Sequence, residues 1–294
     1  MQASLGYVVP SSSGTDVPSM HTIDDIARTA ELGNLNHLWV SDHLLWWHPM
    51  HEALTLLATL AARTTTTRIG TAVLQLAMRE PVATAKALAT IERLSGGRLT
   101  VGIGVGGEFP AEWDATASDR RTRGRRTDQM IDSFKDMWGP GQEGVDLYPK
   151  PSMQPPIWIG GRSDASLKRA AKRADGWMGL FLTPERFASM LAKCRAYAEE
   201  GGRDPAALLP SLYVWTCIAD SNEEARRIAQ NILGGFYNLP FDKLSRYAIL
   251  GDVEHCRERF AEFEDAGARH FAVSPIWPES TKEPLERLLS IGRS

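Results

Sequence analysis

The chain has 294 residues, of which 43% are hydrophobic and 23% charged, so its composition is that of a folded globular protein rather than a disordered chain. Its 33 Lys and Arg residues nearly balance 36 Asp and Glu residues, which argues against a nucleic-acid binder that acts through bulk positive charge. Three cysteines with no CxxC spacing exclude a disulfide framework and favour a reducing, cytoplasmic compartment.

Neither a secretory signal nor a membrane span is expected. The N-terminal sequence, MQASLGYVVP, lacks a basic region followed by a long apolar stretch. The most apolar segment, Ala53–Ala62, is about half as long as a membrane span requires, so it is interpreted as a buried helix.

Short apolar runs, typical of buried strands, alternate along the chain with longer segments of helical periodicity. Strands are predicted at Leu5–Val9, His37–Val40, Arg68–Leu74, Leu99–Val105, Ile157–Ile159, Gly176–Leu182, Leu212–Ile218 and His270–Ser274. Helices are predicted from Thr22 up to Gly33 and from the end of the Arg-rich stretch at Arg126 to Trp138. Further helices are predicted at His51–Arg63, Pro81–Leu94, Ala165–Ala174, Pro184–Glu200, Glu223–Ile232, Val253–Ala266 and Glu283–Leu289.

Eight predicted strands that are continuous apolar runs, alternating with helices, indicate a parallel sheet covered by helices. At this length the pattern predicts an α/β fold, a (β/α)8 TIM barrel with irregular insertions after its fourth and seventh strands, in one domain over residues 1–294. The alternative is an open doubly wound sheet, but no GxGxxG motif follows the first strand, where YVVPSSSG stands instead.

Asp42 and His43 directly follow a predicted strand, at the end of the barrel where catalytic residues lie. A histidine at this place can act as an acid or a base. The alternative is that Asp42 caps the next loop and His43 lies on the surface. The nearby His48 and His51 would allow the metal site of a barrel hydrolase, but the first strand, LGYVV, supplies no histidine ligand.

Two glycine-containing segments follow later strands. IWIGGRSDAS, residues 157–166, joins a strand to a helix, so its glycines and the free N–H groups of the helix start predict a phosphate site. A tight turn with Ser163 or Asp164 as the helix cap is the alternative. GIGVGGEFPAEW, residues 102–113, predicts close approach of the backbone to a cofactor, with Glu108 or Glu112 as a nearby carboxylate, or else a bulged strand end. Because Pro110 follows, no helix is expected directly after these glycines.

A dense basic cluster comes next, formed by Arg120, Arg121, Arg123, Arg125 and Arg126. The cluster could pair with the phosphates or the acidic tail of a ligand. The alternative is that it forms a solvated loop tip. Nine tryptophans, several of them at or beyond predicted strand ends, would suit the walls around a ring-shaped ligand, although tryptophan also fills protein cores.

The sequence resembles the luciferase-like monooxygenase family, the superfamily of bacterial luciferase, over most of its length. Three segments carry the resemblance: AELGNLNHLWVSDHLL (residues 30–45), RIGTAVLQLAMREPVATAKALATIERLSGGRLTVGIGVG (68–106) and PPIWIGGRSDASLKRAAKRADGWM (155–178). Members of this superfamily use flavins or deazaflavins on a (β/α)8 barrel. The sequence is most similar to the branch that uses the deazaflavin coenzyme F420.

The resemblance implies roles for matching positions. Asp42 would contact the cofactor, and His43 would lie at its reactive face as proton donor or charge stabiliser. Ala72–Val73 would form a non-proline cis peptide that backs the ring, with Gln75 near the polar edge of the ring. The residues that would line the cofactor or hold its phosphate are Gly106, Gly107, Gly160, Gly161 and Ser163. Related sugar-phosphate dehydrogenases carry a catalytic Glu directly after a glycine on the fourth strand, which makes Glu108 the candidate here, behind an extra glycine.

The implied function is an oxidoreductase that transfers a hydride between coenzyme F420 and a small organic substrate, with His43 assisting proton transfer. An FMN-dependent monooxygenase that uses reduced flavin and oxygen is the first alternative, because FMN shares the ring shape and the phosphate. A metal-dependent barrel hydrolase and a non-catalytic flavin-binding protein are the others. Relatives often dimerise, so a homodimer is expected, without a nucleic-acid or membrane partner.

Overall fold

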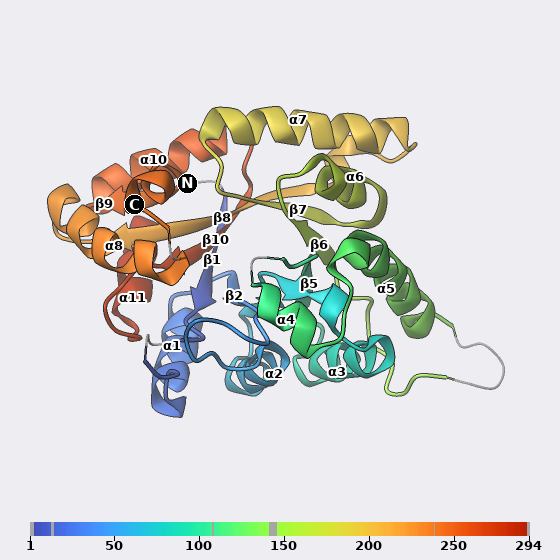
Figure 1. Ribbon diagram of the computed structural model, residues 1–294. Helices are drawn as coiled ribbons and strands as arrows, with labels where there is room; N and C mark the ends of the chain where they lie inside the picture. The colour runs from blue at the N-terminus through green and yellow to red at the C-terminus, as the bar shows by residue number, and fades with distance from the viewer. Residues whose placement is uncertain (1–2, 13–14, 108, 141–145, 238, 293–294) are drawn as a thin grey trace.

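The computed structural model describes residues 3–12, 15–107, 109–140, 146–237 and 239–292, and its strands form one parallel sheet (Figure 1). The strands are β1 Ser4–Val9, β2 His37–Val40, β3 Arg68–Thr71, β4 Leu74–Gln75, β5 Leu99–Gly104, β6 Ile157–Gly160, β7 Gly176–Leu180, β8 Leu209–Ile218, β9 Ile249–Gly251 and β10 His270–Pro275.

The sheet closes on itself. Its order is β10-β1-β2-β3-β5-β6-β7-β8, and β8 pairs in turn with β10, so these eight strands form a ring. The short β4 pairs with β5, and β9 pairs with the end of β8. The predicted (β/α)8 TIM barrel is therefore confirmed.

The third predicted strand is interrupted in the structure. The sequence predicts one strand over Arg68–Leu74, whereas β3 ends at Thr71 and β4 begins at Leu74. The bond between Ala72 and Val73 is a cis peptide, as the family resemblance implies, and it lies in this interruption. Since β4 then pairs with the last residues of β5, Gln75 lies beside Gly104 at the carboxyl end of the barrel.

Helices surround the barrel, and α4, Pro110–Ala115, lies over the segment after β2 (Figure 1). They are α1 Met20–Leu32, α2 Ala53–Arg63, α3 Pro81–Leu94, α4 Pro110–Ala115, α5 Arg123–Trp138, α6 Asp164–Arg173, α7 Pro184–Glu200, α8 Asn222–Tyr237, α9 Phe241–Leu244, α10 Val253–Asp265 and α11 Glu283–Ile291. Two of them, α3 and α7, have the predicted bounds, and both start with a proline at the first helical position. None of the described helices is long and apolar enough to cross a membrane.

Three helices differ most from the prediction. Helix α9, like strand β9, lies in the insertion after the seventh predicted strand, which the sequence predicts to be irregular. Pro110 begins α4, whereas in the sequence this proline is the reason to expect no helix there; a proline suits the first helical position because its missing N–H is not needed. Helix α8 continues past Ile232, its predicted end, through a pair of glycines to Tyr237. Leu233 is buried in this added turn, so packing outweighs the low helix propensity of glycine.

Alternate residues of the strands fill two separate layers. On β2, Leu38 and Val40 pack in the layer beneath the helices, whereas Trp39 belongs to the cluster inside the barrel. The ring centroid of Trp39 lies 5.1 Å from that of Trp158 on β6 and 4.6 Å from that of His37. The amino-terminal half of the barrel is therefore a packed core of aromatic rings.

Two histidines are buried in this interior in the neutral form. Trp39 Nε1 donates a hydrogen bond of 3.0 Å to His270 Nε2, and because an indole N–H can only donate, that ring nitrogen carries no proton. Ser4 Oγ lies 2.6 Å from the other ring nitrogen. Burial lowers the pKa of His270 to about 3, and burial together with nearby His270 holds the pKa of His37 well below its ordinary value.

We expect the fold to lose stability in mild acid. In the unfolded chain both histidines gain a proton near pH 6.5, whereas folded His270 gains one only near pH 3. The free energy of unfolding therefore keeps its full value above about pH 6.5 and falls below it, by about 1.4 kcal/mol per pH unit for each histidine. Urea unfolding at about pH 7.5 and about pH 5.5 measures the difference.

Two variants identify the groups responsible for this acid sensitivity. His270→Gln removes one titrating group and should flatten the dependence of unfolding free energy on pH. His21→Gln is the control, because the His21 side chain is 86% exposed, and it should keep the wild-type slope. A wild-type slope in His270→Gln would contradict the prediction.

Candidate active site

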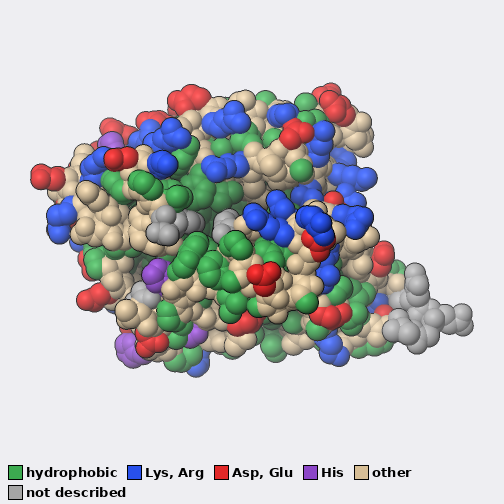
Figure 2. All heavy atoms as spheres, in the orientation of Figure 1, with side chains coloured by type: hydrophobic (Ala, Val, Ile, Leu, Met, Phe, Trp, Pro, Cys, Tyr) green, Lys and Arg blue, Asp and Glu red, His purple; other side chains and the backbone are tan. Residues whose placement is uncertain are grey.

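A cavity of about 510 Å³ opens at the carboxyl ends of the barrel strands. Figure 2 shows a hollow on this face of the molecule with hydrophobic side chains around it. The predicted site residues that line the cavity are Asp42, His43, Ala72, Val73, Gln75, Gly106, Gly160 and Gly161. Gly107 and Ser163 are not among the lining residues, and Glu108 lies outside the residues that the structure describes.

Asp42 lines the cavity, but its carboxylate is fully buried and fully engaged. Its Oδ2 accepts a hydrogen bond of 2.8 Å from the backbone N–H of Gln75, and its Oδ1 accepts one of 2.7 Å from Arg79. Arg79 also donates to Glu52, at 2.9 Å. The carboxylate therefore fixes β4 against the end of β2, and direct contact of Asp42 with a cofactor stays a prediction.

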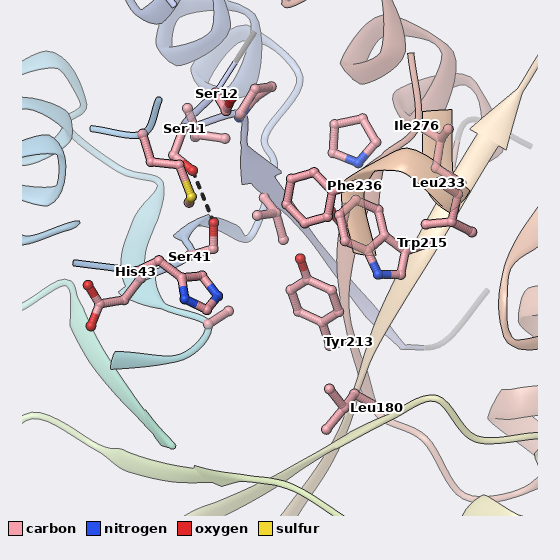
Figure 3. A pocket seen from close by; sticks show the side chains of 18 of the residues that line it. Ser11, Ser12, Ser41, His43, Leu180, Tyr213, Trp215, Leu233, Phe236 and Ile276 are labelled. Carbon is pink, nitrogen blue, oxygen red and sulfur yellow. Dashed lines mark hydrogen bonds between the residues drawn. The ribbon is translucent and has the colours of Figure 1, made fainter. Parts of the chain in front are cut away.

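His43 lies on the cavity wall (Figure 3). Its Nδ1 is 2.9 Å from Nε2 of Gln75, which donates, and 3.2 Å from Oε2 of Glu112, which accepts. Each partner suits a different ring tautomer, so the other nitrogen, Nε2, can serve as a proton acceptor or donor. Nε2 makes no hydrogen bond to the described part of the chain. The ring packs on Trp46, with centroids 3.8 Å apart.

Glu112 is the carboxylate that the fold brings to His43. It lies in the first turn of α4, and its side chain is fully buried. Its Oε1 accepts hydrogen bonds from the backbone N–H groups of Leu44, at 2.6 Å, and Leu45, at 3.2 Å. The sequence offers Glu112 only as an alternative to Glu108. It could not favour Glu112, because no helix is expected at this place to direct the side chain toward the end of β2. A proline followed by an acidic residue is a helix-start signal that would have favoured it.

Glycines form the floor of the cavity around Val73. A Cβ on Gly104 would lie 2.5 Å from Cγ2 of Val73, and one on Gly160 would lie 2.8 Å from its Cγ1. Gly106 has a φ of +67°, and a Cβ there would lie 2.4 Å from Oε1 of Gln75. Backbone and one branched side chain thus form a smooth surface that suits a flat ring.

The residues predicted to hold a phosphate are only partly at the cavity. Gly160 and Gly161 line it. Ser163 caps α6 by accepting a 3.2 Å hydrogen bond from the backbone N–H of Ser166, as the alternative interpretation expects. The carbonyl of Gly107 accepts a 3.0 Å hydrogen bond from Arg120, the nearest member of the basic cluster. Phosphate binding by this segment stays a prediction.

The described residues do not gather a metal centre or a reactive thiol at the cavity. No group of three or more His, Cys, Asp or Glu side chains that could hold a metal occurs among them. His51 Nε2 lies 2.8 Å from the carbonyl of Pro18, away from the partners of His43. The cysteines are free and buried, and burial raises the thiol pKa to about 11 for Cys194 and to about 12 for Cys217 and Cys256.

Comparison with known proteins identifies the family that the chain matches. The family model for luciferase-like monooxygenases matches residues 3–248. The first curated relatives are uncharacterized mycobacterial proteins that are 33% identical over 166 residues, and this match spans 53% of the chain and 57% of their length. An F420-dependent glucose-6-phosphate dehydrogenase of Kribbella flavida is 26% identical, with 93% of this chain and 92% of that protein covered.

Solved structures show the same fold. An F420-dependent secondary alcohol dehydrogenase in complex with an F420–acetone adduct matches with a TM-score of 0.84 and 20% identity, covering 99% of this chain and 98% of that one. A monooxygenase from Streptomyces bottropensis matches with a TM-score of 0.80 and 19% identity, covering 98% of each chain.

Proposed function

The chain belongs to the luciferase-like monooxygenase family, and from this premise we propose that it is an oxidoreductase that transfers a hydride between coenzyme F420 and a small organic molecule. The observation that carries the proposal is the pairing of His43 with Gln75 and Glu112 beside the glycine floor. An acid–base group thus lies next to a surface for a flat ring. The F420-dependent relative that aligns over 93% of the chain supports the choice of cofactor.

The floor of the cavity fits a ring of the flavin type. Oε1 of Gln75 is buried without a hydrogen-bond partner among the described residues. A buried acceptor without a hydrogen bond lowers the stability of the fold. An N–H group on the edge of a bound ring would supply the hydrogen bond that this oxygen lacks. We propose that Val73, Gly104 and Gly160 lie against the ring, and that the backbone near Gly161 holds the phosphate.

When bound, coenzyme F420 would supply or accept the hydride. The chain would supply the proton transfer and the environment. With its Nδ1–H directed to Glu112, His43 presents Nε2 as the acceptor for an alcohol proton. With Nδ1 accepting from Gln75, it presents an Nε2–H that donates to a carbonyl oxygen. Trp46 covers the imidazole and keeps water from one side of it.

Parallel titrations with coenzyme F420 and with FMN, each oxidised and reduced, test the cofactor. Tryptophan fluorescence reports binding, because Trp215 and Trp277 line the cavity. We expect the deazaflavin to bind at least about tenfold more tightly than FMN. A preference for FMN would overturn the proposal and favour the monooxygenase alternative. Deazaflavin binding without turnover of any alcohol or carbonyl compound would favour a non-catalytic role.

A further inference from the structure

Opposite His43, the cavity is walled by apolar side chains (Figure 3). They come from the carboxyl ends of β7 and β8, from α8 and from the segment after β10, and they include Leu180, Tyr213, Trp215, Leu233, Phe236 and Ile276. The glycine floor supplies backbone and one valine, whereas this wall supplies hydrocarbon and aromatic rings. The wall therefore differs in composition from the floor assigned to the cofactor, although both line the same cavity.

Aromatic contacts connect this wall to His43. The ring centroids of Trp215 and Phe236 are 5.2 Å apart, and those of Phe236 and Trp46 are 5.7 Å apart. Trp46 in turn packs on His43. A molecule whose reacting group is beside His43 would thus place its remaining atoms against an aromatic surface.

The charges around the apolar wall disfavour an anionic substrate there. No Lys or Arg occurs among the described lining residues. The lining carboxylates are Asp42, which is bound to Arg79, and Glu279, an exposed residue at the rim. A phosphate held against this apolar wall would lose its hydration without meeting a Lys or Arg side chain, whereas the cofactor phosphate is assigned to the backbone near Gly161, at the start of α6. Arg120 lies outside the lining, at Gly107, and Figure 2 shows Lys and Arg side chains gathered beside the hollow, near α5 and α6.

We propose that this cavity selects an uncharged alcohol or carbonyl compound with a hydrocarbon body, and that Trp215 and Phe236 set this specificity. The reaction assigned to the substrate rests on the proposed function, whereas its chemical class rests on the cavity wall. Phosphorylated sugars are excluded as substrates, although a relative aligned over 93% of the chain is a glucose-6-phosphate dehydrogenase.

Ligand binding tests the substrate class without any turnover. Cyclohexanone, 4-methylcyclohexanone and 4-ethylcyclohexanone differ by single carbon units, and glucose and glucose 6-phosphate serve as uncharged and anionic comparisons. Quenching of tryptophan fluorescence in the full chain, with and without bound cofactor, reports the dissociation constants. We expect each added carbon to tighten binding about fourfold. Glucose 6-phosphate should bind no better than glucose.

A matched pair of variants tests the wall itself. Phe236→Arg places a cation inside the cavity, and Leu239→Arg places one just outside it, because Leu239 is 46% exposed and is not a lining residue. Phe236→Arg should weaken binding of 4-ethylcyclohexanone by at least about tenfold and improve that of glucose 6-phosphate. Leu239→Arg should change neither. Circular dichroism checks that both variants retain the fold.

The outcomes separate this inference from the proposed function. Equal affinities along the ketone series, or tighter binding of glucose 6-phosphate than of glucose, would overturn the substrate class even if the cofactor binds as proposed. A preference for FMN would overturn the proposed cofactor, and the ketone series measured without cofactor would still decide the substrate class. Unchanged ketone affinity in Phe236→Arg would overturn the role of Phe236.

Discussion

Replacing His43 by alanine is expected to lower kcat by about 10²–10⁴-fold while changing the dissociation constant for coenzyme F420 by less than about twofold. The variant removes the Nε2 atom that would accept or donate the proton. It leaves the floor around Val73 and Gly104 intact, so the ring should still bind. Single-turnover absorbance of the cofactor measures the rate, and fluorescence titration measures the affinity.

His48→Ala is the matched control for this prediction. His48 lines the same cavity, with its ring centroid 6.1 Å from that of Phe236, but it has no hydrogen bond to Glu112 or Gln75 among the described contacts. Its loss should lower kcat by less than about tenfold. Added imidazole should restore part of the rate of His43→Ala. Equal losses in both variants, with no rescue by imidazole, would assign the effect to disturbed packing.

Replacing Glu112 by alanine is expected to impair both the fold and the reaction. The change leaves the N–H groups of Leu44 and Leu45 without their acceptor, which should lower the free energy of unfolding by about 2–4 kcal/mol. It also frees the ring of His43, so kcat should fall by at least about tenfold. Glu112→Gln keeps an acceptor for the backbone and should recover stability, but it lacks the carboxylate that faces Nδ1. Urea unfolding and steady-state kinetics measure both effects.

Glu80→Ala is the control that separates a loss of fold stability from a loss of the positioning of His43. Glu80 caps α3 by accepting hydrogen bonds from the N–H groups of Val82 and Ala83, and it does not line the cavity. This variant should lose about 1 kcal/mol of stability and keep its kcat. If Glu112→Gln were as active as the wild type, Glu112 would be a structural residue of the α4 region rather than a positioning residue for His43.

The barrel could be predicted from the sequence because its signals are local. Each buried strand is a short apolar run, and helices such as Pro81–Leu94 have start and stop residues that fix their ends within one turn. Parallel strands separated by helices then allow few arrangements at this chain length. The position of Asp42 and His43 at a strand end followed from the same argument, and the cis bond at Ala72–Val73 followed from the family resemblance.

The partners within the site could not be predicted in this way. His43 and Glu112 are 69 positions apart, and they meet because α4 folds back over the segment after β2. The residues alone offered Glu108 or Glu112 as the nearby carboxylate, and the family resemblance favoured Glu108 rather than the Glu112 that contacts His43 in the structure. A short helix after several glycines has little local signal. The carboxylate of Asp42 likewise looks available in the sequence, yet Arg79 and Gln75 engage it in the folded chain.

The sequence by itself thus determined the barrel, the end of it at which the cavity opens, and the family, because these depend on periodic burial and on contiguous segments. The tertiary structure decided which side chains share the cavity. Trp215 on β8 and Phe236 on α8 form one wall because α8 continues past its pair of glycines. No local sequence pattern predicts this contact. The physical reason is that the selectivity of a cavity arises from side chains distant in sequence, whose positions are set by the closed sheet beneath them.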